Sequence, residues 1–212
     1  MKLIAIRHGE TEWNRQGREM GQLDSPLTRR GIKQAHAIAE RLSAFGFTTL
    51  YSSDLGRARE TAEVIASRSG KQIHLDDGLR ERNMGIFQGL TRTEMRERFP
   101  RERGDYERIG FEFVIPNGES AKQRLERSVR VLTAIAERHP NENVVAVTHG
   151  GFLMGFLEHV LCIPPGNGSR FKRRNASYNA FNHENGMWNL ETWNDISHLE
   201  DTVALDDPTV QA

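Results

Sequence analysis

Cysteine is almost absent from this chain of 212 residues: Cys162 is the only one, so no disulfide can form within the chain, as is typical of proteins of a reducing cytoplasm. No apolar run approaches the roughly 20 residues of a membrane span, and the first residues lack the apolar region of a signal peptide. The formal net charge is zero, which gives no electrostatic reason to expect a nucleic acid or a membrane as partner. We therefore expect a cytoplasmic protein that binds neither of them.

Arginine, in contrast, is abundant: 24 of the 29 basic residues are arginine. A planar guanidinium suits phosphate and carboxylate groups, although a GC-rich genome biases the composition in the same direction. At 24.1 kDa the chain is long enough to bury one substantial core, and we expect a single domain over residues 1–212.

Two unbroken apolar runs, residues 3–6 and 144–147, each end in a histidine followed by glycine. Apolar runs without alternation predict strands that are buried on both faces, as in a parallel sheet covered by helices. Ligands of such α/β folds bind at the carboxyl ends of the strands. The pattern therefore places the imidazoles of His8 and His149 on one edge of one sheet, with Arg7 beside them.

Helical periodicity and turn signals between the two runs predict an alternation of helices and strands, which is typical of an α/β fold. The first helix is expected to present Ile32, Ala35, Ile38, Ala39 and Leu42 to the core. The expected helices cover residues 28–45, 55–70, 119–139 and 152–162, and the further strands cover 47–51, 72–75, 178–182 and 187–193.

Residues 92–118 are the least regular part of the pattern. Thr91 has capping-box spacing and opens a short helix that we expect Pro100 to close, and residues 101–118 are expected to be irregular. We interpret 92–118 as an excursion from the domain and a candidate lid. The acidic end of the chain, 200–212, is expected to be mobile.

The polar stretch at residues 10–27 offers candidates for binding an anion. Loops of this length on a rigid sheet often carry function. The side-chain amides of Asn14 and Gln22, the latter beside Gly21, can donate to an oxyanion, or they can simply solvate the loop.

Arg57 and Arg59 fall in the first turn of the helix expected over 55–70, where the helix dipole favours anions over cations. A bound phosphate would explain an arginine at this position. A surface ion pair with Glu60 or Glu63 would explain it equally well, so both interpretations stay open.

Two histidines and two arginines at one sheet edge favour phosphate over a metal ion as ligand. Zinc could use the histidines and an acidic residue of the 76–83 run, but arginines repel a cation. Phosphoryl transfer instead needs donors around three equatorial oxygens, which Arg7, Arg57 and His149 can supply. The neutral imidazole of His8 can attack phosphorus, and a carboxylic acid can protonate the leaving alkoxide.

Five motifs occur in order along the chain: Arg7-His8-Gly9-Glu10 followed by Asn14, Ser53-Asp54-Leu55-Gly56-Arg57-Ala58, Leu79-Arg80-Glu81-Arg82-Asn83-Met84-Gly85, Pro116-Asn117-Gly118-Glu119-Ser120 and Thr148-His149-Gly150-Gly151. Together they resemble the histidine phosphatase superfamily, and most closely its phosphoglycerate mutase-like phosphatases. The resemblance extends from residue 3 to about residue 200.

This resemblance implies a three-layer α/β/α fold with a mixed, mostly parallel sheet, and a site that needs no metal. It implies that His8 is the phosphorylated nucleophile and that Arg7, Arg57 and His149 form the phosphate pocket. It also selects Glu81 as the proton donor and later the base for water. The residues that we expect to contact substrate are Arg7, His8, Asn14, Gly21, Gln22, Arg57, Glu81, Arg92, His149 and Gly150.

We therefore expect a phosphatase without a cofactor, which hydrolyses small phosphorylated metabolites and releases inorganic phosphate. The first alternative is a phosphoglycerate mutase that depends on 2,3-bisphosphoglycerate, but Met84 and Gly151 stand where such mutases carry tyrosine and asparagine. The second is a phosphate-recognition module without catalysis, which would have no use for both His8 and Glu81. The sequence is compatible with a homodimer and leaves the physiological substrate open.

Overall fold

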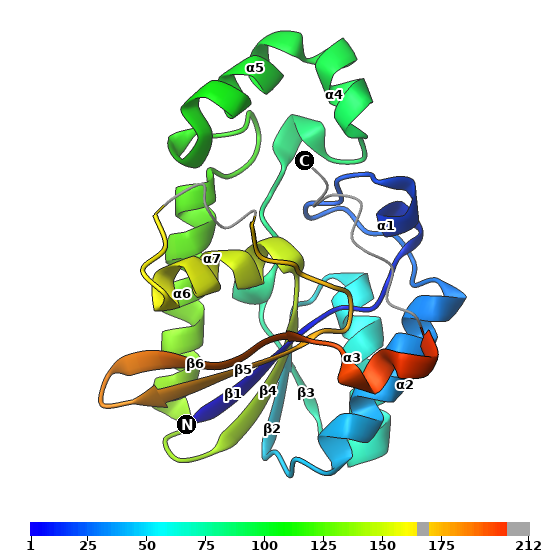
Figure 1. Ribbon diagram of the computed structural model, residues 1–212, viewed down its shortest axis with the longest axis vertical. Coiled ribbons are helices and arrows are strands. Elements are labelled where there is room, and N and C mark those ends of the chain that lie inside the picture. The colour runs from blue at the N-terminus through cyan, green and yellow to red at the C-terminus, as the bar shows by residue number, and fades with distance from the viewer. Residues whose placement is uncertain (165–169, 203–212) are drawn as a thin grey trace.

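The computed structural model describes residues 1–164 and 170–202, in which one six-stranded sheet lies between two layers of helices (Figure 1). This confirms the three-layer α/β/α prediction. The strand order is β3-β2-β4-β1-β5-β6, in which the first four strands are parallel and the final hairpin is antiparallel. The strands are β1 (Lys2–Arg7), β2 (Thr49–Ser52), β3 (Ile73–Leu75), β4 (Asn143–Thr148), β5 (Tyr178–Glu184) and β6 (Met187–Asp195).

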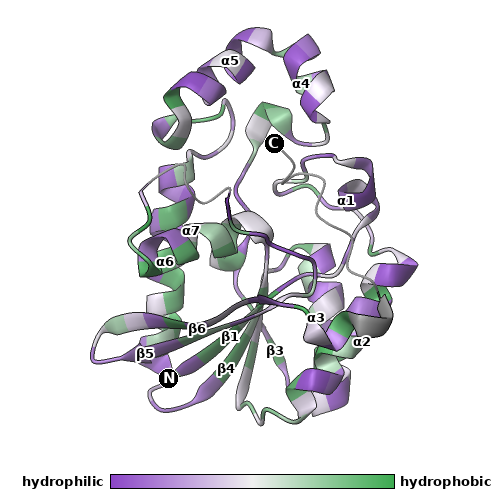
Figure 2. Cartoon of the chain, in the orientation of Figure 1, coloured by the Kyte–Doolittle hydropathy of each residue, from purple (hydrophilic) through white to green (hydrophobic). Residues whose placement is uncertain are grey.

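Strand β1 lies at the centre of the core because its side chains alternate between the two helical layers. Ile4 and Ile6 pack against the helices on one face of the sheet, and Leu3 and Ala5 pack against the helices on the other face. None of these four side chains is exposed. Figure 2 shows the central strands as apolar and the outer faces of the helices as mixed or polar. The layers are α2 (Arg29–Ser43) and α3 (Gly56–Ser69) on one face, and α6 (Ala121–Arg138) and α7 (Gly150–Val160) on the other.

Side chains at the helix starts explain where α2 and α6 begin. The hydroxyl of Thr28 accepts the N–H of Gly31 at 2.9 Å, and Ser120 forms a capping box with Gln123. These contacts satisfy N–H groups that have no partner inside the helix. One detail of the first helix was wrong: Ile32 is 45% exposed and does not join the core.

Helices α4 (Arg92–Arg98) and α5 (Pro100–Ile109) stand apart from the sheet, at the top of Figure 1. As expected, the short helix α4 ends before Pro100. Proline also fits the first turn of a new helix, and α5 begins there, so the expected irregular structure at 101–118 was wrong for most of its length. A separate apolar cluster around Phe87, Met95 and Ile115 supports the two helices. We call α4 and α5 the cap.

Five short helical segments complete the described chain, and among them η5 lies beside α2 (Figure 1). They are α1 (Glu12–Gln16), η1 (Asp77–Leu79), η2 (Gly85–Phe87), η3 (Gly110–Glu112) and η5 (Ser197–Thr202). The expected mobile tail lies, from residue 203 on, outside the described residues. Across the described ranges, no helix combines the length and the apolarity that crossing a membrane requires.

Candidate active site

A cavity of about 460 Å³ opens between the carboxyl edge of the sheet and the cap. Parallel strands β1 and β4 both end at this edge. In α/β folds, ligands bind at the carboxyl ends of the parallel strands. Eight of the residues predicted to contact substrate line the cavity: Arg7, His8, Asn14, Gly21, Arg57, Glu81, Arg92 and Gly150.

His8 follows β1 directly and is 2% exposed. Its Nδ1 lies 2.8 Å from the carbonyl oxygen of Gly9. Because a carbonyl only accepts hydrogen bonds, Nδ1 carries the proton, and in the neutral ring the lone pair is on Nε2. Gly9 itself is required by close packing, since a Cβ there would lie 2.6 Å from the carbonyl oxygen of Gly31.

His149 follows β4 in the same way, and its ring centroid lies 5.2 Å from that of His8. The ring is fully buried, and its Nε2 lies 2.9 Å from the hydroxyl of Ser53. Burial lowers the pKa of His149 well below its ordinary value, and the positive charge of Arg57 contributes. Its Nδ1 is buried without a hydrogen-bond partner among the residues that the structure describes.

Arg57, at the start of α3, is 1% exposed and is oriented by the loop that precedes α2. Its Nη2 donates to the carbonyl of Gly21 at 2.7 Å, and its Nη1 donates to Leu23 at 2.8 Å and to Asp24 at 3.0 Å. Within the described chain, Nε of Arg57 is buried and has no hydrogen-bond partner. Burial lowers the pKa of Arg57, and the carboxylate of Asp24 opposes that change.

The amino end of α3 is capped by a residue that is distant in the sequence. Its N-cap residue, Leu55, makes no side-chain capping bond, and the carboxylate of Asp24 accepts the backbone N–H groups of Gly56 and Arg57. An anionic side chain therefore already satisfies this helix end.

The two explanations offered for the arginines of this helix each apply to one of them. Arg57 turns into the cavity, whereas Arg59 is exposed and pairs with Glu63 at 3.2 Å. An exposed pair of this kind contributes little to stability.

Glu81 reaches the cavity from the segment after η1. Its Oε1 accepts the N–H of Arg82 and its Oε2 accepts the N–H of Gly151, both at 2.7 Å. A Cβ on Gly151 would lie 2.3 Å from Oε1 of Glu81, so any other residue at this position would require the carboxylate to shift. Arg127 fixes this segment from α6 by donating to the carbonyl groups of Gly78, Arg80 and Glu81 at 2.7–3.2 Å.

Asn14 and Gln22 differ in their positions. Asn14 lines the cavity, and its Oδ1 accepts hydrogen bonds from the N–H of Thr11 and from Nδ2 of Asn175, both at 3.1 Å. Gln22 is outside the lining; its Nε2 donates to the carbonyl of Glu81 at 3.2 Å. Gln22 thus contacts the segment that carries Glu81 and does not itself face the cavity.

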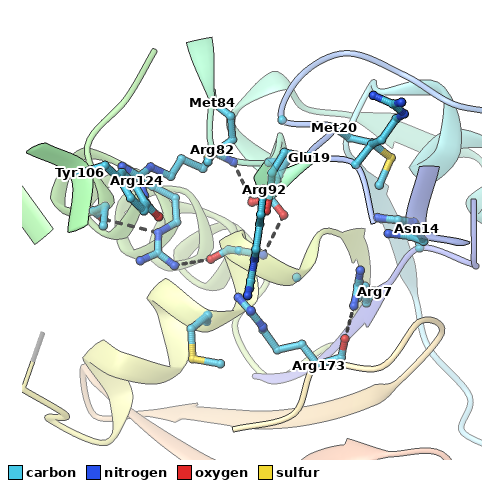
Figure 3. A pocket seen from close by; sticks show the side chains of 18 of the residues that line it. Arg7, Asn14, Glu19, Met20, Arg82, Met84, Arg92, Tyr106, Arg124 and Arg173 are labelled. Carbon is cyan, nitrogen blue, oxygen red and sulfur yellow. Dashed lines mark hydrogen bonds between the residues drawn. The ribbon is translucent and has the colours of Figure 1, made fainter. Parts of the chain in front are cut away.

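The C-terminal part of the chain contributes contacts that the sequence pattern did not indicate. The N–H of Ala176 and Nδ2 of Asn175 both donate to the carbonyl of His8, at 3.2 and 3.1 Å. Nη1 of Arg7 donates to the carbonyl of Arg173 (Figure 3). No periodicity or motif pointed to residues 173–176, because their contacts are long-range and involve mainly backbone.

One side of the cavity, which we call the outer wall, comes from the segment after η1, the cap, α6, α7 and residue 173 (Figure 3). Arg124 and Glu158 form a buried ion pair there at 3.2 Å. Arg82 stacks on Tyr106 with its guanidinium 5.4 Å from the ring centroid. The outer wall consists of Arg82, Tyr106, Arg124, Met154, Glu158 and Arg173.

The arrangement of the side chains that could coordinate a metal ion does not support metal binding. Within residues 1–164 and 170–202, no group of three or more His, Cys, Asp or Glu side chains is arranged to hold a metal ion. Independence of a metal and of a cofactor stays a prediction.

Comparison with known proteins gives consistent relationships over nearly the whole chain. A family model, "Histidine phosphatase superfamily (branch 1)", matches residues 3–196. Phosphoglycerate mutase-like protein 4 of Arabidopsis thaliana is 37% identical over 208 residues, which cover 96% of this chain and 89% of that protein. The metal-independent phosphoserine phosphatase of the same plant is 39% identical over 202 residues, which cover 93% and 83%.

A solved structure agrees with these relatives. The phosphoserine phosphatase of Entamoeba histolytica, crystallised in complex with phosphoserine, superposes with a TM-score of 0.82 at 30% identity. The superposition covers 93% of this chain and 98% of that one.

Proposed function

The chain belongs to the histidine phosphatase superfamily, and from this premise we propose that it hydrolyses small phosphomonoesters through a phosphorylated His8. One observation carries the proposal. Nε2 of His8 carries a lone pair. In addition, two buried atoms have no hydrogen-bond partner in the described chain: Nδ1 of His149 and Nε of Arg57. Buried polar atoms are costly unless satisfied, and the oxygens of a phosphate group would satisfy both.

In the first step, Nε2 of His8 attacks phosphorus and the bond between phosphorus and the ester oxygen breaks. The guanidinium groups of Arg7 and Arg57 stabilise the charge on the equatorial oxygens. In the tautomer that we propose for His149, the hydroxyl of Ser53 donates to Nε2, and Nδ1 carries the proton and donates a hydrogen bond to the phosphate. The products of this step are phospho-His8 and an alkoxide that needs a proton.

Glu81 is the proton carrier in both steps. As the acid, it protonates the leaving alkoxide; as the carboxylate, it then takes a proton from the water that attacks phospho-His8. The second attack breaks the bond between phosphorus and Nε2, which releases inorganic phosphate and restores neutral His8. The backbone N–H groups of Arg82 and Gly151 keep the carboxylate in position between the two steps.

The substrates that we propose are small phosphorylated metabolites with an alkyl leaving group. The cavity of about 460 Å³ accommodates a small molecule, and Tyr106 and Glu107 of the cap contribute to its lining. Relatives that act on phosphoserine support this size class. We further propose that no metal and no cofactor take part, and that the protein acts in the cytoplasm.

Trapping of the phosphoenzyme tests the proposal directly. Purified protein in EDTA is mixed with ³²P-labelled phosphomonoester and quenched in alkali, in which phosphohistidine survives. The label should appear on wild-type protein, should be lost in acid, and should be absent from His8→Ala. Turnover of p-nitrophenyl phosphate without any label on the protein would exclude the covalent route.

A mutase activity is the second candidate, because relatives carry that name. The same phosphoenzyme would then return its phosphate to a phosphoglycerate faster than to water. Measuring phosphate release and the conversion of 3- to 2-phosphoglycerate in one reaction separates the two activities. We expect phosphate release to dominate.

A further inference from the structure

Arg173 connects the phosphate-binding residues with the rest of the outer wall. Its backbone carbonyl accepts a hydrogen bond from Nη1 of Arg7, so its main chain lies directly beside the proposed phosphate site. Its side chain extends from there along the cavity, as Figure 3 shows. A group bound by this side chain would therefore lie in the same cavity as the phosphate.

Three of the other arginines that line the cavity have carboxylate partners. Arg18 pairs with Glu94 at 2.6 Å, Arg57 with Asp24 at 3.0 Å and Arg124 with Glu158 at 3.2 Å. These pairs fix the walls of the cavity and compensate the charge of each guanidinium.

Arg173 differs from those three in its surroundings. Within residues 1–164 and 170–202 its guanidinium has no carboxylate within ion-pair distance, and its buried Nε has no hydrogen-bond partner. The pKa of Arg124 is lowered, mainly by burial and partly by the charge of Arg173, so that charge acts on the outer wall. A partly buried cation without a counter-charge is unfavourable unless a ligand supplies the anion.

We infer that Arg173 binds a carboxylate on the leaving group, so that the preferred substrates are phosphomonoesters of small hydroxy acids. The planar guanidinium matches a carboxylate through two parallel hydrogen bonds. Because Arg7 contacts the main chain of Arg173 and both side chains line one cavity, a single small substrate can carry the phosphate and the carboxylate. This inference rests on the proposed phosphatase activity and adds the chemical class of its substrate.

Two pairs of substrates that differ in the carboxylate test the inference. Phosphoserine is compared with phosphoethanolamine, and 3-phosphoglycerate with glycerol 3-phosphate, by kcat/KM. We expect wild-type protein to prefer the carboxylated member of each pair by about 10- to 100-fold, as for a hydrogen-bonded charge pair. In Arg173→Gln this preference should fall to near unity, mainly through a higher KM.

The control variants separate charge from geometry. Arg59→Gln removes an exposed arginine outside the cavity and should keep the full preference. Arg173→Lys keeps the charge without the planar fork and should show an intermediate preference; it also replaces Arg173→Gln if that variant does not fold.

The possible failures are distinguishable. If wild-type protein turns over neither p-nitrophenyl phosphate nor any of the four esters, the proposed function is wrong, and this inference with it. If it hydrolyses them without a preference, or if Arg173→Gln retains the preference, only the role of Arg173 is wrong. A stronger preference for fructose 1,6-bisphosphate than for either carboxylated ester would also overturn it, because the second anion would then be a phosphate.

Discussion

The carboxyl ends of β1 and β4 have the same local design, a buried strand followed by histidine and glycine, yet the two histidines are placed in different hydrogen-bonding environments. His8 binds a backbone carbonyl through Nδ1, which leaves a lone pair on Nε2. His149 contacts the hydroxyl of Ser53 through Nε2, and its buried Nδ1, which has no partner among the described residues, is the atom that we propose to donate to the phosphate. The comparison teaches that the hydrogen bond on the far nitrogen, more than the position on the sheet, distinguishes a nucleophile from a donor.

The largest effect should come from removing the nucleophile. We expect His8→Ala to lose at least about 10⁴-fold in kcat, because no covalent intermediate can form. The protein should still bind inorganic phosphate, which isothermal titration measures. Turnover near the wild-type level would mean that the two histidines have been assigned the wrong way round.

Removing the second histidine should have a smaller effect. His149→Ala deletes one donor to the phosphate, and removal of a single such donor typically lowers kcat by about 10²- to 10³-fold. Phospho-His8 should still form, only more slowly, which rapid quenching can follow. If His149→Ala folds but takes up no label at all, the assignment of His8 as the nucleophile and of His149 as a donor to the phosphate would be contradicted.

Glu81 contributes the proton that neither histidine supplies. For Glu81→Gln we expect roughly a 10²-fold loss of kcat on alkyl phosphates and a much smaller loss of phosphoenzyme formation with p-nitrophenyl phosphate, whose leaving group hardly needs protonation. Single-turnover rates on the two substrates provide the measurement. Equal losses on both would exclude the role of acid.

Ser53 offers a more delicate test of the same comparison. In Ser53→Ala the partner of Nε2 of His149 is lost, so the ring no longer favours the tautomer with the proton on Nδ1. We expect about a 10-fold lower kcat, similar to the loss of one hydrogen bond, with the label on His8 preserved. Ser43→Ala, a change at an exposed helix end, is the matched control, and equal activity of the two variants would exclude the effect.

The smallest effect concerns stability and follows from the lowered pKa of His149. An unfolded histidine titrates near pH 6.5, so between about pH 7.5 and 5.5 the unfolded state takes up a proton that the folded state does not, and stability falls as the pH falls. His149 should contribute on the order of 1 kcal/mol to this loss. Chemical denaturation of wild type and His149→Gln at both pH values measures it; an unchanged pH dependence in the variant would contradict the prediction.

The sequence predicted the sheet, its four main helices and the meeting of Arg7, His8, Arg57, Glu81 and His149, because hydrophobic periodicity and motif order are local signals. It did not predict how Arg57 is oriented. Asp24 and Gly21 reach it across a loop, and nothing in the sequence indicates that approach.

The cap was misjudged for another reason. Residues 100–109 are highly charged and none of them is buried, so the apolar periodicity that identifies a helix is weak there. Proline at position 100 was interpreted as an end although it also suits a beginning.

The hydrogen bonds from Asn175 and Ala176 to the carbonyl of His8 have a consequence for biosynthesis. A nascent chain released up to residue 174 already contains the residues that we assign to phosphate chemistry, but the main chain of its nucleophile lacks two of its anchors. Strand β5, which completes the sheet on the other side of β1, is also still missing at that stage. The order of translation therefore delays assembly of the working site until residues 175–184 have been made.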